Sequence, residues 1–316
     1  MDENISLKAN GELPFRRKKQ MPSGAKIALI IVAAILVLAI LGGVAMGAVI
    51  LCFVTAIGLI VVLTMPENDG TFEYEVYGDE IEIVGLVDSS YSGVLEIPAY
   101  IDGKAVTEIG SYAFCNYTEI TEVYIPDTVK TIGYSAFYAC HSLNTVEIGE
   151  SVETIEDWAF LECKGLERIK IPDSVTSIGY SAFELCTSLT SVEMGNSVTY
   201  IGDYAFDHCY ALESILLSSS LEEIGTYAFR ECSNLNEITI PQSVNLISEN
   251  AFFSSGLNSV IFENNTDNWS LYLPDDEIYN EDIIIFAHEL TPENAAHYLT
   301  KQYAQYVWCQ LVQTEY

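Results

Sequence analysis

The sequence predicts a repeat solenoid with a parallel β-sheet on one side and short helical or turn segments on the other, preceded by an N-terminal transmembrane helix. Three observations support this: an Ala-Phe pair recurs every 23 residues, one 39-residue run carries no charge, and the acidic residues gather after that run. The 316-residue chain therefore combines a net charge of −32 with a positive mean hydropathy of +0.24.

Charge divides the chain into three parts. Residues 1–26 form a basic tail with six basic and three acidic side chains, residues 27–65 are uncharged, and the remaining 251 residues hold seven basic and 42 acidic side chains, a net of −35. Phosphate backbones would be repelled by so acidic a surface, which argues against nucleic-acid binding. Aromatic residues make up 11% of the chain, so the composition is typical of a folded domain rather than a disordered one.

The uncharged run at 27–65 is predicted to be a transmembrane segment. A continuous helix of this length would measure about 58 Å against a hydrocarbon core of about 30 Å, and a cleaved signal peptide has an apolar region of only about 7–15 residues. Two interpretations stay open: one long helix, or a helical hairpin that turns near Gly42, Gly43 and Gly47, with spans of about 18 residues each.

Flanking charge bears on the direction of insertion. Basic residues such as Arg16, Arg17 and Lys26 precede the run, whereas Glu67 and Asp69 follow it. This asymmetry favours a cell-membrane protein with a cytoplasmic N-terminus and an extracellular repeat domain. A hairpin would return the acidic domain to the cytoplasm.

The repeats occupy residues 106–262. An Ile stands five positions before each repeated Phe, and a pattern Leu-x-x-(Val/Ile)-x-(Ile/Met/Leu) follows, as in Leu143, Val146 and Ile148. This alternation predicts a short strand in each repeat, and repeats too short to enclose an apolar face must stack to bury it. The seven Phe residues are Phe114, Phe137, Phe160, Phe183, Phe206, Phe229 and Phe252.

Both ends of the array need caps, because stacked repeats otherwise expose apolar edges. Residues 66–105 are predicted to form a β-rich N-terminal cap, with strands at 72–77 and 80–84 joined by Gly78-Asp79. Residues 263–316 are predicted to form a C-terminal cap with a helix at about 292–312. Thr291-Pro292 would start this helix, and Ala295, Leu299, Tyr303, Val307 and Leu311 would lie on one face.

Units such as residues 132–143, with Pro126, Pro172 and Pro241 after the strands, resemble the BspA-type leucine-rich repeat over about residues 97–262. The resemblance implies a leucine-rich-repeat solenoid. It also implies a surface protein of bacteria or some protists that binds host proteins, matrix proteins or other cells. The chain has no Leu-Pro-x-Thr-Gly wall-sorting motif, so the apolar run would serve as the anchor.

The sequence predicts no enzyme, no cofactor and no metal site. One segment, from Gly133 to Phe137, begins like a nucleophile elbow but lacks its final glycine. Five cysteines recur at the 23-residue period and are predicted to be small, buried, unpaired thiols: Cys140, Cys163, Cys186, Cys209 and Cys232. A set of aromatic residues just before the Ala-Phe pairs could pack between repeats or bind partners: Tyr112, Tyr134, Trp158, Tyr180, Tyr204 and Tyr227.

The candidate binding surface is the outward side of the predicted strands, where stacking aligns side chains into two columns. Arg168 and Lys170 are two of only seven basic residues in the domain, and Glu147 and Glu193 flank them. They form either cross-strand charge pairs or an anchor for a ligand carboxylate. The candidate set is Arg168, Lys170, Glu147, Glu193, Tyr124, Thr145 and Leu216.

These observations lead to a predicted function: a non-catalytic, membrane-anchored surface protein whose solenoid binds a protein or glycan partner, with the lipid bilayer contacting the apolar segment. Two alternatives stay open, a hairpin-anchored scaffold facing the cytoplasm and a structural component of the cell envelope.

Overall fold

The computed structural model describes residues 67–263, 269–272, 283–285, 291–302 and 307–310. Contacts divide the chain between Met65 and Pro66, and every described residue belongs to the second unit. The predicted basic tail and transmembrane segment lie outside the described residues. Within the described ranges, no helix combines the length and the apolar character needed to cross a bilayer.

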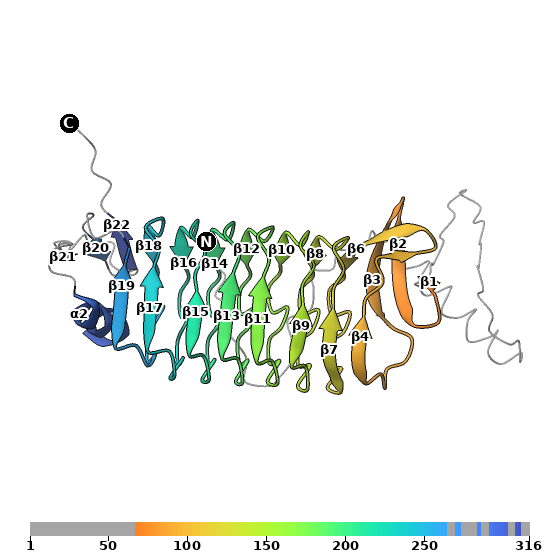
Figure 1. The fold of residues 1–316 in the computed structure, drawn as a ribbon, viewed down its shortest axis with the longest axis horizontal. Helices are drawn as coiled ribbons and strands as arrows, with labels where there is room; N and C mark the ends of the chain where they lie inside the picture. The colour runs from red at the N-terminus through yellow and green to blue at the C-terminus, as the bar shows by residue number, and fades with distance from the viewer. Residues whose placement is uncertain (1–66, 264–268, 273–282, 286–290, 303–306, 311–316) are drawn as a thin grey trace, which may run out of the picture. The chain divides into compact units, whose positions relative to one another are not determined.

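The described unit is a solenoid in which each turn contributes one strand to each of two rows (Figure 1). We call the first row the short-strand sheet, because most of its strands have two residues. Its parallel strands are β3 (Glu80–Leu86), β6 (Lys104–Ile109), β8 (Thr131–Ile132), β10 (Thr154–Ile155), β12 (Ser177–Ile178), β14 (Tyr200–Ile201), β16 (Glu223–Ile224) and β18 (Leu246–Ile247). Matching positions pair from one turn to the next, as Ile155 does with Ile178.

We call the second row the long-strand face. Its strands are β4 (Gly93–Glu96), β7 (Ile120–Tyr124), β9 (Thr145–Glu147), β11 (Arg168–Ile171), β13 (Ser191–Met194), β15 (Ser214–Leu216), β17 (Glu237–Ile240) and β19 (Ser259–Phe262). Hydrogen bonding joins them in three groups, β4–β7–β9, β11–β13–β15 and β17–β19. The predicted solenoid is confirmed, with eight turns, because β3 and β4 add one turn before the first Ala-Phe pair.

The predicted helical segments between the strands are turns instead. Between residues 107 and 262 the structure has only strands, turns and irregular segments. Two residues in each repeat adopt positive φ, as Trp158 (61°) and Glu162 (60°) do. Such left-handed residues interrupt the run of right-handed backbone that a helix needs.

Phenylalanine rings form the centre of the solenoid. The seven repeated Phe side chains are almost completely buried and their rings stack in sequence, with centroid distances such as 5.2 Å between Phe137 and Phe160. Backbone hydrogen bonds also join neighbouring turns beside these rings: Phe137 N donates to Ala159 O at 2.8 Å. Burying one aromatic ring per turn supplies the apolar area that a single repeat cannot enclose.

The five periodic cysteines lie beside this stack as free, buried thiols, as predicted. Each thiol donates to the carbonyl of a Phe in the preceding repeat, as Cys163 Sγ does to Phe137 O at 3.1 Å. The other four bonds join Cys140 to Phe114, Cys186 to Phe160, Cys209 to Phe183 and Cys232 to Phe206.

Strands cap the N-terminal end, as predicted. β2 (Phe72–Tyr77) and β3 form an antiparallel hairpin whose closing pair is Tyr77 with Glu80. β1 (Glu67–Asn68) pairs with β2, and β5 (Tyr100–Ile101) pairs with β6. β1 and β2 extend the short-strand sheet beyond the first turn of the solenoid, whereas β5 lies off this path.

The C-terminal end differs from the prediction. The expected helix over 292–312 consists of only α2 (Pro292–His297) and the π-helical turn η2 (Tyr298–Gln302), and β22 (Val307–Gln310) is a strand. β22 pairs antiparallel with β18, the last strand of the short-strand sheet. An unpaired strand edge is costly and prone to aggregation, so pairing at this edge outweighs the four-residue spacing that predicted a helix.

The remaining elements complete this cap. β20 (Trp269–Tyr272) pairs antiparallel with both β22 and β21 (Ile283–Ile285). α2 packs against β19, where Figure 1 shows it beside the last long strand. The Thr291 hydroxyl accepts from Asn294 N, and the Asn294 side chain accepts from Thr291 N, so the predicted helix start is confirmed.

Candidate binding surface

The long-strand face presents alternate side chains to solvent. On β11, Arg168 and Lys170 are exposed, whereas Ile169 and Ile171 are buried. Arg168 pairs in register with Ser191 and Lys170 with Glu193, while Glu193 pairs with Leu216. Stacking therefore aligns these side chains into the two expected columns.

A shallow hollow of about 690 Å³ lies over β9, β11, β13 and β15. Its floor is apolar, formed by Val146, Ile169, Val192 and Ile215. Five predicted site residues line it: Thr145, Arg168, Lys170, Glu193 and Leu216. Leu216 is 63% exposed, an unusual state for a large apolar side chain in the middle of a sheet face.

The basic pair makes few contacts within the chain. Lys170 Nζ lies 3.3 Å from Glu150 Oε1, and both side chains are more than 60% exposed. The side chain of Arg168 has no ion pair or hydrogen bond to any described residue. An exposed pair is worth roughly 0–1 kcal/mol, so a partner carboxylate could compete for both cations at little cost.

The rest of the predicted set lies at the edges of this arrangement. Glu147 and Tyr124 pair in register but do not line the hollow. The hydroxyl of Tyr124 donates to Glu122 at 2.8 Å, and this bond raises the pKa of Tyr124. Within the described ranges, neither basic residue forms an ion pair with Glu147 or Glu193, one of the two expected alternatives; Lys170 contacts Glu150 instead.

Sequence reasoning missed Glu150, because it lies beyond the strand, in the following turn. Its backbone N–H donates to Asp127 in the preceding repeat, which holds the turn next to β11. Lys170, Glu193 and Leu216 also line an adjoining hollow of about 400 Å³ that includes Glu150. The two hollows share these three side chains, so Lys170 stands between them.

A row of aromatic rings runs along the turns on the other side of the solenoid. Successive centroids lie 5.1–6.2 Å apart through Tyr112, Tyr134, Trp158, Tyr180, Tyr204 and Tyr227. The rings come from two repeat positions, because Ser135 and Ser181 occupy the usual aromatic position and the preceding tyrosines supply the ring instead. Packing between repeats therefore accounts for the aromatic spacing.

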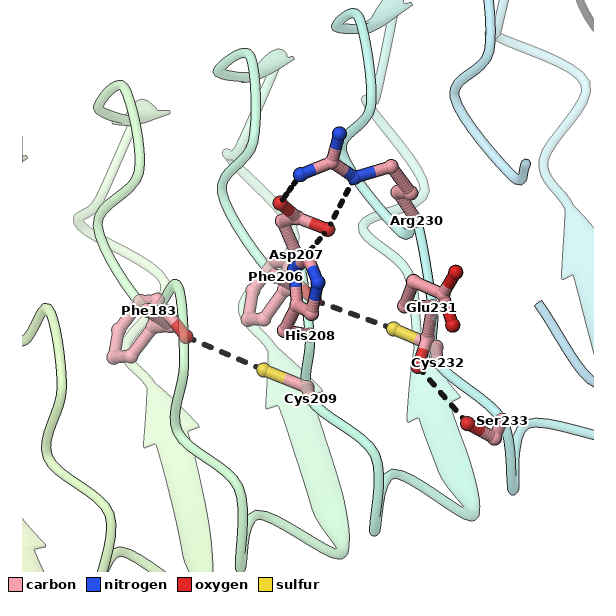
Figure 2. Close-up of polar contacts among 9 residues, drawn as sticks. All are labelled: Phe183, Phe206, Asp207, His208, Cys209, Arg230, Glu231, Cys232 and Ser233. Carbon is pink, nitrogen blue, oxygen red and sulfur yellow. Dashed lines mark hydrogen bonds and ion pairs between the residues drawn. The ribbon is translucent and has the colours of Figure 1, made fainter. Parts of the chain in front are cut away.

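An ion pair between Asp207 and Arg230, drawn in Figure 2, lies beside the last two rings of this row, Tyr204 and Tyr227. The Asp207 side chain is fully buried and accepts two hydrogen bonds from the Arg230 guanidinium, one of them 2.9 Å long at Nε. These bonds raise the pKa of Arg230. His208 Nδ1 lies 2.8 Å from Asp207 Oδ1, and the guanidinium carbon lies 4.7 Å from the Tyr227 ring centroid and 5.4 Å from that of Tyr204.

The described residues contain no group of three or more His, Cys, Asp or Glu side chains placed to hold a metal ion. The Asp207 cluster joins two neighbouring repeats, and its contacts hold these repeats together. Leucine-rich-repeat families are generally non-enzymatic, so the long-strand face is the leading candidate for function.

Comparison with known proteins agrees with this fold. A family model of the BspA type leucine rich repeat region matches six copies, over residues 107–175 and 159–273. A leucine-rich-repeat protein of T. pallidum is 28% identical, with 60% of this chain and 89% of that chain covered and a TM-score of 0.55. One from Bacteroides capillosus is 31% identical, with 41% and 97% covered and a TM-score of 0.37.

Curated proteins include no match to the sequence. The family model spans more than half of the chain, and it matches the repeats that form the stacked turns. The chain belongs to the BspA-type leucine-rich-repeat family.

Proposed function

We propose that the protein is a membrane-anchored surface protein. Its long-strand face would bind exposed carboxylates of a partner protein. One observation carries the binding part: Arg168 and Lys170 stand at the centre of a hollow with an apolar floor, in a domain of net charge −35. Leucine-rich-repeat families typically mediate protein interactions, and for this reason we favour a protein partner over a glycan.

The chemistry of the hollow suits a protein interface. Arginine binds carboxylates through two parallel hydrogen bonds and is enriched in interface centres, whereas lysine acts as a point charge. Leu216 and the floor residues Ile169 and Val192 provide apolar contact beside the charges. Binding would not require Arg168 to leave another partner among the described side chains.

The anchoring part of the proposal rests on the sequence. The 39-residue uncharged run follows a basic tail and precedes the acidic domain. With a single span, the preference of basic residues for the cytoplasmic side supports a cytoplasmic tail and an extracellular solenoid.

A charge-reversal experiment tests the binding face. The full chain in detergent micelles, with Arg168→Glu and Lys170→Glu together, is compared with wild type on an array of extracellular and cell-surface proteins. We expect the variant to lose the proteins that wild type captures. The matched control, Lys130→Glu with Lys164→Glu, makes the same charge change at exposed lysines that do not line the hollow, and it should retain them.

Equal capture by wild type and both variants would reject the long-strand face as the binding site. Circular dichroism on all three proteins establishes that the solenoid is intact, so a loss of capture can be assigned to the surface.

A further inference from the structure

A separate hollow of about 460 Å³ lies on the short-strand side, over β10, β12 and β14. Tyrosines and carboxylates line it together, and none of its lining residues is basic. Those that matter here are Tyr134, Tyr180, Tyr200, Glu156, Asp157 and Asp203. Tyr180 is 37% exposed, and its ring belongs to the aromatic row.

Each carboxylate in this hollow uses one oxygen to hold the backbone. Asp157 Oδ1 accepts from Tyr180 N, and Asp203 Oδ1 accepts from Thr226 N, both at 2.7 Å. Glu156 Oε2 accepts from Tyr134 N at 2.7 Å. No described residue donates to the second oxygen of any of the three. The carboxylates are therefore fixed in position and keep a free acceptor.

Among the described residues, no basic side chain lines the hollow to neutralise the charge of these carboxylates. Burial raises the pKa of Tyr180 and of Tyr200, and the negative charges of Asp157 and Asp203 raise both further. A cation entering the hollow would meet carboxylates and ring faces together.

The same aromatic row already holds one guanidinium. At its C-terminal end the Arg230 guanidinium lies over the Tyr227 and Tyr204 rings. The same guanidinium binds the Asp207 carboxylate (Figure 2). Stacking on rings and a fork-shaped hydrogen-bond pattern favour arginine over lysine in such a site. In the neighbouring repeats on its N-terminal side, over β10, β12 and β14, rings and carboxylates lie together with no arginine of the described chain among the lining residues.

We propose that this hollow is a second binding site, which takes arginine side chains from a basic segment of a partner protein. The site uses surfaces and charges distinct from those of the long-strand face, since the two hollows share no lining residue. Failure of either proposal therefore leaves the other standing.

The test is a fluorescence-anisotropy titration of the full chain in detergent micelles with a labelled Gly-Arg-Gly-Arg-Gly peptide. The variant Asp157→Asn with Asp203→Asn keeps each Oδ1 acceptor for the backbone but removes two charges. We expect it to weaken peptide binding by at least about tenfold, because charge-assisted hydrogen bonds are lost.

The matched control is Asp127→Asn with Asp173→Asn. These two aspartates hold Glu150 N and Asn196 N in the same way, at 2.8 and 2.7 Å, but do not line the hollow. The control changes net charge equally and should bind the peptide as wild type does. Equal weakening by the two double variants would show attraction to overall charge and would overturn the proposal.

Two further measurements keep the result interpretable. Tyr180→Leu leaves every carboxylate in place and should also weaken binding, because the ring contact is lost; unchanged binding would contradict the aromatic part of the site. A matched Gly-Lys-Gly-Lys-Gly peptide should bind more weakly, and equal affinity for both peptides would overturn the assignment to arginine.

Discussion

At the scale of single residues, Asp207 carries a charge whose burial is energetically costly. Its carboxylate is fully buried, and it has three close basic nitrogens, two from Arg230 and one from His208. A buried charge is tolerated only when paired, and removal of one partner of a buried pair costs about 3–5 kcal/mol. Two repeats before Asp207, Leu161 occupies the equivalent position and shows an apolar alternative.

Arg230→Met should therefore lower the free energy of unfolding by about 3 kcal/mol, the lower end of that range, because the arginine itself is partly exposed. Adding Asp207→Leu should recover much of the loss, since it removes the uncompensated charge. Denaturant melts of both variants measure this. A single variant as stable as wild type would show that the pair contributes little.

The periodic thiols lead to a second expectation, about pH. Burial raises the pKa of Cys140 to about 12, and it raises the pKa values of Cys163, Cys186, Cys209 and Cys232 as well. The folded state thus keeps protons that the unfolded state releases above pH 9. This contribution to stability is complete below pH 9 and declines as pH rises towards 12.

The expected loss is about 1.4 kcal/mol per pH unit for each thiol over that range. Urea melts between pH 8.5 and 10.5 measure the slope, and Cys186→Ala should reduce it by one thiol's share. An identical slope in wild type and variant would contradict the assignment of protonated, buried thiols.

At the scale of elements, the spacing between turns is set by close backbone contact. A Cβ built on Gly202 would lie 2.6 Å from the backbone carbon and oxygen of Gly179, the equivalent residue of the preceding repeat. No side chain fits there without moving one turn away from the next. Ser248, two repeats further along, occupies the same repeat position and already carries a Cβ.

Gly202→Ala should consequently cost about 1–3 kcal/mol in unfolding free energy through overpacking. Ser248→Ala serves as the control and should be close to neutral, because it adds no atoms. Equilibrium melts compare the two. A neutral Gly202→Ala variant would show that the turns can separate without penalty.

Sequence patterns predicted some of the elements correctly and others incorrectly. The 23-residue spacing of Ala-Phe predicted the stacked strands because each Phe occupies one fixed core position. It could not distinguish helical segments from turns, since the positive φ of residues such as Trp158 has no signature in composition. The spacing of Ala295 and Leu299 predicted a helix correctly only as far as Gln302; the strand Val307–Gln310 depends on the distant edge of β18.

The candidate site was likewise predicted only in part. Strand alternation placed Arg168 and Lys170 on one exposed face, as expected. The hollow beneath them and the contact between Lys170 and Glu150 depend on how a turn in one repeat approaches a strand in the next. Such contacts between repeats cannot be inferred from the period alone.

At the scale of the whole molecule, the acidic charge belongs to the repeat domain. The 251 residues after the apolar run carry a net charge of −35, which favours solubility and opposes association between copies. Against this background the long-strand face offers a basic centre, and the short-strand side offers rings and free carboxylate oxygens. Both proposed sites can bind extracellular partners only if the solenoid lies on the extracellular side of the membrane.

The most direct test of the proposed surface location is residue-resolved labelling of intact cells with a membrane-impermeant amine-reactive biotin. The account predicts that the exposed solenoid lysines Lys130, Lys164 and Lys170 are labelled on intact cells, whereas Lys18, Lys19 and Lys26 of the basic tail react only after lysis. Mass spectrometry identifies the labelled peptides. Solenoid lysines that stay unlabelled until the cells are lysed would contradict the surface location and favour the cytoplasm-facing scaffold.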